Sequence, residues 1–238
     1  MPDARAAQDP RSGHRPAALL FDFGGTLDGA ALTWKERMFR LCRAEGVAVT
    51  PEQFDPLFYG TDEALVGAIP ATLSLEETVR RLVARLAIGL GVSDARLVDR
   101  IATRFLDGAT RSVRDNAALL SELASRYHLG LVSNFYGNLT AVCDELGIRS
   151  LFRVIVDSER VGCRKPDPRI FRHALDELGV KSGEATFVGD SLARDMAGAR
   201  GIGMAHIWLV GEAVSPSPPC CHGDRVIRSL GELRAVLL

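Results

Sequence analysis

From residue 114 to the C-terminus, short apolar runs alternate strictly with segments of helical periodicity. The apolar runs, each the length of a strand, cover residues 129–133, 152–157, 185–189, 204–210 and 225–227. Helical segments lie between them at about 115–127, 138–146, 168–178 and 191–200, and one more follows at the C-terminus. Strands that alternate with helices in this way pair in parallel, because each crossover returns the chain to the same edge of the sheet. We therefore predict an α/β protein with a Rossmann-like, mostly parallel sheet and helices on both faces.

A further strand, at residues 17–23, lies far upstream of the others and ends at Gly24. The residues after it show only helical patterns, with apolar side chains at helical spacing from Trp34 onward and a capping box that begins at Ser74. This predicts an all-helical unit inserted between the first strand and the second. The predicted division of the chain is a disordered tail at residues 1–15, a sheet core at 16–28 and 112–238, and the helical unit at 29–111.

The composition is that of an ordinary globular protein, with 47% hydrophobic and 25% charged residues. The chain has 29 basic and 30 acidic side chains, and its net charge of −1 argues against nucleic acid or an anionic membrane as a partner. No apolar run reaches the roughly 18 residues of a membrane span, and residues 1–15 lack the apolar stretch of a secretory signal. Five cysteines, an odd number, do not indicate a disulfide scaffold. We therefore expect a cytoplasmic protein that binds no nucleic acid and no membrane.

Polar side chains lie at the carboxyl ends of four predicted strands. Asp22 closes the first strand, Ser133 and Asn134 close the second, Lys165 follows the third and Asp190 follows the fourth. Reactive groups collect at this edge of a parallel sheet, so we expect these side chains to converge. Two carboxylates and an ammonium group are costly to bury together unless a cation and an anionic ligand neutralise them. The sequence therefore indicates a site for an anion and a cation.

Four motifs, in this order, resemble those of the haloacid dehalogenase-like hydrolase superfamily. They are Asp22-Phe-Gly-Gly-Thr26-Leu, Leu-Val-Ser133-Asn134, Lys165-Pro-Asp-Pro-Arg-Ile-Phe and Val-Gly-Asp190-Ser-Leu-Ala-Arg-Asp195. The unit at 29–111 resembles the helical cap that some members insert directly after the first strand. The resemblance covers roughly residues 16–238 and implies an enzyme, a hydrolase that acts on a small phosphorylated metabolite.

The resemblance implies a role for each matching residue. Asp22 would be the nucleophile, which attacks phosphorus and forms an aspartyl-phosphate. Ser133 would hydrogen-bond a phosphoryl oxygen, with help from the amide of Asn134. Lys165 would neutralise the charge that Asp22 shares with the transferring group. Thr26 would brace the turn after the nucleophile, and it counts with Asn134 among the expected phosphate-binding residues.

The resemblance also implies Mg²⁺ as the cofactor. Asp22, Asp190 and the backbone carbonyl of Gly24 would hold the ion, and such a set of oxygen ligands suits Mg²⁺. Asp195 would be a further metal ligand or would support the ligands from behind. The helical cap would close over this site, exclude bulk water and supply most of the residues that select the substrate.

The first motif departs from the pattern of the phosphatases in this superfamily, which carry a second aspartate where this chain has Gly24. That acid protonates the leaving group and later activates water, and general acid–base catalysis contributes about 10²–10⁴-fold. A phosphatase without it needs a substrate with a good leaving group, such as an acyl phosphate, a phosphoanhydride or an aryl phosphate, or a substrate with its own proton donor. Alternatively, a nearby group such as Asp28 replaces the missing acid.

Two other interpretations stay open. Superfamily members that cleave carbon–halogen or carbon–phosphorus bonds also lack this acid. A dehalogenase, however, would not need the metal site, and a phosphonate hydrolase would need a lysine in the cap, where Lys35 is the one lysine. The last interpretation is a protein that binds phosphate and Mg²⁺ without catalysis. We favour a Mg²⁺-dependent phosphatase that acts through Asp22.

Two features lie outside the four motifs. Phe135 and Tyr136 directly follow Asn134, and because that loop must border the site we expect both rings to line the pocket. The run Cys220-Cys221-His222 lacks the cysteine spacing of a zinc site, and we expect a surface loop there.

Overall fold

Six strands form one parallel sheet in the computed structural model, which describes residues 15–211 and 225–238. Their order across the sheet is β3-β2-β1-β4-β5-β6, and every neighbouring pair is parallel, as predicted. The strands are β1 (Ala18–Phe21), β2 (His128–Ser133), β3 (Val154–Asp157), β4 (Ala185–Gly189), β5 (Ala205–Leu209) and β6 (Arg225–Ile227). The predicted tail, apart from its last residue, and the Cys220-Cys221-His222 run lie outside the described residues.

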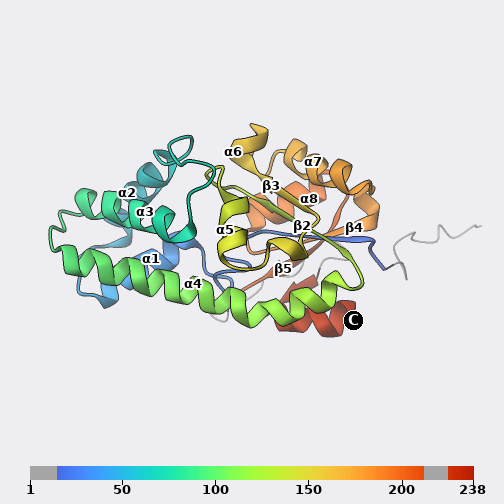
Figure 1. The fold of residues 1–238 in the computed structure, drawn as a ribbon, viewed down its shortest axis with the longest axis horizontal. Coiled ribbons are helices and arrows are strands. Elements are labelled where there is room, and N and C mark those ends of the chain that lie inside the picture. Colours follow the sequence, from blue (N-terminus) through green and yellow to red (C-terminus); the bar gives the residue numbers. More distant parts are fainter. Residues whose placement is uncertain (1–14, 212–224) are drawn as a thin grey trace, which may run out of the picture.

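Two layers of helices cover the sheet (Figure 1). One face packs against α4, α5 and α9 through residues such as Leu120 and Val142, and the other packs against α7 and α8 through Phe171 and Ala199. None of the helices in the described parts of the chain combines the length and the apolar character that a bilayer span requires. The helices are α1 (Trp34–Ala44), α2 (Pro51–Glu63), α3 (Leu75–Gly89), α4 (Ala95–Ala124), α5 (Leu139–Glu145), α6 (Ser158–Val161), α7 (Pro168–Leu178), α8 (Ala197–Gly201) and α9 (Leu233–Leu237).

The described chain forms α1–α4 and no strand between β1 and β2, in agreement with the helical pattern of that region. The sequence also predicted a separate helix at about 115–127, and this was wrong. Instead, α4 is one helix of 30 residues that runs from the inserted helices to the sheet (Figure 1). Its buried face continues without a break through Ile101, Phe105, Val113 and Leu120. The predicted boundary at 111/112 therefore falls inside a continuous helix, and the division into core and cap stays a prediction.

The predicted helix at 191–200 is only partly α-helical. Residues 192–196 form a π-helical turn, in which the N–H of Met196 bonds the carbonyl of Ser191, and α8 begins after it. The wider turn buries Asp195 directly beside the end of β4. The sequence predicted a regular α-helix from residue 191, and it did not predict this π-helical turn.

Polar contacts join α3 and the residues just before it to α5 and to the loop that precedes α5. The side-chain amide of Asn138 donates to the carbonyl of Leu73 at 2.9 Å and to the hydroxyl of Thr78 at 2.8 Å. The carboxylate of Glu145, at the end of α5, accepts the N–H of Leu75 at the start of α3. The contacts of Asn138 are buried, so their loss would leave unpaired donors and acceptors, and they hold α3 against the loop after β2.

The centre of the sheet has no room for a side chain at Gly130. A Cβ atom there would lie 2.5 Å from Leu20 Cδ2 and 2.8 Å from Val154 Cγ1. We expect Gly130→Ala to lower the free energy of unfolding by about 1–3 kcal/mol, because overpacking forces the core to shift. Urea denaturation measures the loss. Gly183→Ala is the matched control, since nothing lies within 4 Å of a Cβ at that position, and equal stability of the two variants would show that the sheet centre tolerates the methyl group.

Candidate active site

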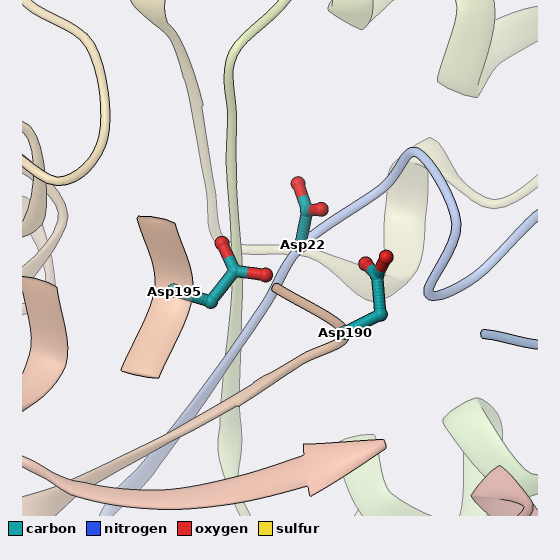
Figure 2. Close-up of side chains that lie close together, drawn as sticks. All are labelled: Asp22, Asp190 and Asp195. Atoms are coloured by element: carbon teal, nitrogen blue, oxygen red, sulfur yellow. The ribbon is translucent and has the colours of Figure 1, made fainter. Parts of the chain in front are cut away.

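Three aspartates meet at the carboxyl edge of the sheet (Figure 2). Asp22 follows β1 and Asp190 follows β4, and these strands are parallel neighbours, so their ends lie side by side. Asp195 comes from the π-helical turn after β4. One carboxylate oxygen from each residue lies within 4.8 Å of the other two. The predicted convergence of Asp22 and Asp190 is therefore present in the structure.

The ammonium group of Lys165 lies between two of these carboxylates. Its Nζ is 2.7 Å from Asp22 Oδ1 and 2.7 Å from Asp195 Oδ1, and all three side chains are buried. Burial alone would lower the pKa of Lys165, but the charges of Asp195 and Asp22 outweigh this effect and raise it above its ordinary value. The amine therefore stays protonated and supplies a fixed positive charge beside Asp22.

Asp190 has a different environment. Its Oδ1 accepts the hydroxyl of Thr26 at 2.8 Å, and it forms no ion pair with any described residue. Burial, together with the carboxylates of Asp22 and Asp195, raises the pKa of Asp190 to about 8. Gly25 makes the close approach possible: its φ is +91°, and a Cβ there would lie 2.7 Å from Asp190 Oδ2. The site thus holds three carboxyl groups and one ammonium group.

The two residues at the end of β2 do different things. The hydroxyl of Ser133 donates to Asp22 Oδ1 at 2.7 Å, so it directly contacts the predicted nucleophile. The amide of Asn134 is occupied at both ends by the backbone of Lys165: its Oδ1 accepts the N–H at 2.7 Å and its Nδ2 donates to the carbonyl at 3.1 Å. This placement favours a role in fixing Lys165 over direct contact with a substrate.

Thr26, Asp195 and Gly24 were also predicted site residues. Thr26 is fully buried behind Asp190 and does not border the cavity described below, which favours orienting Asp190 over binding phosphate. Asp195 uses Oδ1 for Lys165 and Oδ2 for the N–H of Ser191, so both its oxygens have partners. Gly24 does border the cavity.

Asp28 does not fit the role of a replacement acid. It is completely buried, its Oδ1 accepts the N–H of Gly25 at 2.8 Å, and its Oδ2 accepts Trp34 Nε1 at 2.7 Å and Arg37 Nη1 at 2.9 Å. It does not border the cavity either. Three donors, one of them the guanidinium group of the Arg37 ion pair, already occupy its two oxygens. Asp28 instead ties the turn after Asp22 to the first turn of α1.

A cavity of about 110 Å³ opens at Asp22, between the sheet edge and helices α1 and α2. Phe135 and Tyr136 line it, which confirms the expectation for this loop. The rings of Trp34 and Phe135 pack edge to face with centroids 5.6 Å apart and form an aromatic wall. The sheet side contributes Asp22, Gly24, Ser133, Asn134 and Lys165, and the helical side contributes Trp34, Lys35, Tyr59 and Asp62.

Among the cavity residues that the sequence did not predict, two are charged. Asp62 lies in the last turn of α2, far from any strand end, and its position depends on how α2 packs. Arg194, between Asp190 and Asp195 in the sequence, also borders the cavity. Its position in the sequence between two predicted metal ligands could have identified it as a site residue. For Asp62 the sequence contained no such signal.

Residues 19–209 match the protein family described as haloacid dehalogenase-like hydrolase. The match spans all four motifs and the inserted helices. The chain belongs to the haloacid dehalogenase-like hydrolase family. The four motifs predicted this family.

Relatives within the family carry different activities in their names. A mouse protein named haloacid dehalogenase-like hydrolase domain-containing protein 3 is 37% identical over 126 residues, which is 50% of each chain. The chain therefore spans about half the length of such relatives. A phosphoserine phosphatase of Thermus thermophilus is 39% identical over 92 residues, which cover 39% of this chain and 35% of that protein. A crystal structure of a dehalogenase shares the fold with a TM-score of 0.64 and 20% identity, over 94% of this chain and 97% of that one.

The lysine between the two carboxylates should carry a large share of the stability of this hydrolase. We expect Lys165→Met to lower the free energy of unfolding by about 3–5 kcal/mol, because it leaves buried charges uncompensated. Lys35→Met is the control: Lys35 pairs with Asp55 at a partly exposed position, and its loss should cost about 1 kcal/mol or less.

Urea denaturation of both variants measures the difference. A second variant pairs Lys165→Met with Asp195→Asn, which removes one of the uncompensated charges, and it should recover part of the lost stability. Equal losses for Lys165→Met and Lys35→Met would show that the buried ion pairs of Lys165 matter no more to stability than an exposed one.

Proposed function

We propose that this chain is a Mg²⁺-dependent phosphatase that hydrolyses a small phosphorylated metabolite through an aspartyl-phosphate at Asp22. The observation that carries the proposal is the asymmetric environment of the Asp22 carboxylate. The hydroxyl of Ser133 and the ammonium of Lys165 both contact Oδ1, each at 2.7 Å. No described residue donates to Oδ2, and Asp22 borders the cavity. Oδ2 is thus the oxygen that is available to attack phosphorus.

The reaction has two displacements at phosphorus. Asp22 Oδ2 forms a bond to phosphorus while the bond to the leaving group breaks, which gives the aspartyl-phosphate. Water then attacks phosphorus, releases inorganic phosphate and restores the carboxylate of Asp22. Lys165 and Ser133 hold Oδ1 throughout, and in the second displacement they stabilise the negative charge that returns to the Asp22 carboxylate. Little reorganisation is needed, because these contacts already exist.

The donor set fits Mg²⁺. The carboxyl group of Asp190 has one described hydrogen-bond partner, the neutral hydroxyl of Thr26, and burial together with the carboxylates of Asp22 and Asp195 raises its pKa to about 8 even though the charge of Lys165 opposes this. Oxygen ligands from Asp190, Asp22 and the carbonyl of Gly24 would hold the ion, which supplies charge neutralisation for the phosphoryl oxygens when bound. We assign Asp195 to the support of Lys165, since both its oxygens are occupied.

Two further considerations support a phosphatase for a small substrate. The phosphoserine phosphatase among the relatives acts on phosphorus rather than on a carbon–halogen bond, as its name states. The cavity, at about 110 Å³, has room for a phosphoryl group with a small leaving group. We also propose that the protein is cytoplasmic and that its substrate is a soluble metabolite.

The other activities fit the site less well. A dehalogenase would leave the Asp190 carboxyl buried without a counter-ion, which is costly. A phosphonate hydrolase needs a neutral lysine amine. Burial lowers the pKa of Lys35, but Asp55, Tyr59 and Glu36 together outweigh this effect and raise it. A binding protein without catalysis would have no use for a nucleophile whose second oxygen is free and faces the cavity.

Asp22→Asn should abolish turnover. Asparagine keeps the shape of the side chain but removes the nucleophilic carboxylate, so neither phosphate release nor a phosphoenzyme is expected. Acetyl phosphate with Mg²⁺ is the probe, and the phosphoenzyme is detected as radiolabelled protein that hydroxylamine cleaves. Asp176→Asn, an exposed position on α7, is the control and should react like the wild type. Labelling of the Asp22→Asn variant would place the nucleophile elsewhere.

Mg²⁺ should stabilise the wild type through Asp190. A ligand at 100 times its Kd adds about 2.7 kcal/mol, which raises Tm by roughly 5–10 °C for a chain of this size. Asp190→Asn removes a carboxylate ligand, and its Tm should no longer respond to Mg²⁺. Thermal unfolding with Mg²⁺ or with EDTA measures the shift, again with Asp176→Asn as control. The same shift in the Asp190→Asn variant would mean that the ion binds elsewhere.

A further inference from the structure

The proposed reaction lacks one component, a proton donor for the leaving group. Gly24 occupies the position of that acid in related phosphatases, and Asp28 is committed to its ion pair and hydrogen bonds. An alkoxide is a poor leaving group, so without a donor the site would be restricted to activated phosphates. Among the described residues that line the cavity, the carboxyl groups belong to Asp22 and Asp62. Asp22 is the proposed nucleophile, which leaves Asp62.

Asp62 lies where α2 contacts the loop after β2. It lies in the last turn of α2, and its Oδ1 accepts a short hydrogen bond from the hydroxyl of Tyr136. Tyr136 is buried and follows Ser133 and Asn134 in the loop after β2. No described residue donates to or accepts from Oδ2 of Asp62, so this oxygen is free to exchange a proton with a group in the cavity.

The surroundings of Asp62 raise the pKa of its carboxyl group. Burial raises its pKa, and this effect exceeds the opposing effects of the Tyr136 hydrogen bond and the charges of Arg164 and Arg194. An exposed aspartate would lose its proton well below neutral pH and would have none to donate. The environment therefore shifts Asp62 in the direction that a general acid requires.

We propose that Asp62 is the general acid and base of this hydrolase and performs from α2 the task for which related phosphatases use the residue at position 24. The inference rests on the proposed phosphatase function. As the bond between phosphorus and the leaving-group oxygen breaks, the electron pair stays on that oxygen and the proton of Asp62 moves to it. The resulting Asp62 carboxylate then takes a proton from the water that attacks the aspartyl-phosphate, and both aspartates return to their initial states.

Tyr136 is a positioning residue in this scheme. Its hydroxyl holds Oδ1 of a side chain that borders the cavity, and Oδ2 is left without a described partner. Asp62→Asn keeps a carbonyl oxygen that accepts the same hydrogen bond, so it removes the proton while preserving the contact between α2 and the loop after β2. This variant therefore separates a chemical role of Asp62 from a structural one.

The experiment compares two substrates of nearly equal size, acetyl phosphate and ethyl phosphate. Acetate is stable as an anion and needs no proton to depart, whereas ethoxide does need one. Rapid mixing with Mg²⁺ measures the rate of phosphoenzyme formation for each substrate. For Asp62→Asn we expect this rate to fall by about 10²–10⁴-fold with ethyl phosphate and to change by less than about tenfold with acetyl phosphate. Decay of the phosphoenzyme should also slow, since the base is lost.

The control is Glu52→Gln, an acid-to-amide change at an exposed position of the same helix, which should alter neither rate. Equal slowing with both substrates would show that Asp62 serves the structure only and would overturn the inference, as would unchanged rates with both. A wild type that reacts with acetyl phosphate but never with ethyl phosphate would overturn it too, because no donor would then be present. Failure of the wild type to form a phosphoenzyme from acetyl phosphate would instead contradict the proposed function itself.

Discussion

The buried ammonium group of Lys165 is the interaction on which the arrangement of the site depends. It lies 2.7 Å from one oxygen of Asp22 and 2.7 Å from one oxygen of Asp195, and without it two buried carboxylates would face each other. Its position is fixed from β2, because the amide of Asn134 bonds both the N–H and the carbonyl of the lysine. Ser133, the neighbouring residue, reaches the same oxygen of Asp22. One strand end therefore sets both contacts that polarise Asp22, and the pairing of β2 with β1 places them.

Two further contacts link this centre to the rest of the chain. Asp190 approaches so closely that only a glycine is tolerated at position 25, whose Cβ would otherwise lie 2.7 Å from the carboxylate. Asp28 accepts the N–H of Gly25 and also binds Trp34 and Arg37 at the start of α1. The turn that follows Asp22 thus contacts Asp190, at the end of β4, and is tied through Asp28 to the first inserted helix. A movement of α1 would therefore shift the turn after Asp22, because Asp28 binds both.

The sequence predicted the parts of this structure that follow from periodicity and from strand ends. Strictly alternating elements require a parallel sheet, and polar residues at its carboxyl edge converge whatever the details of the helices, so Asp22, Ser133, Lys165 and Asp190 could be identified. The continuity of α4 could not, because residues 106–114 read equally well as a helix or as a junction. The partners of Asp28 and the position of Asp62 were also beyond reach. Both depend on how the inserted helices pack against the sheet, and the local sequence does not determine that packing.

The absence of an acid at position 24 is related to the aromatic wall of the cavity, because Trp34 lies beside Gly24. A Cβ at Gly24 would lie 3.5 Å from Trp34 Cδ1 and Nε1, so the indole borders the space that an acid would occupy. Trp34 also donates to Asp28 and packs on Phe135, which makes it part of both the α1 contact and the cavity wall. A donor at position 24 would be present whether or not the inserted helices lie against the sheet. A donor at Asp62 is held at the cavity by the contact of α2 with Tyr136. Proton transfer from α2 would therefore depend on the packing of the inserted helices against the loop after β2.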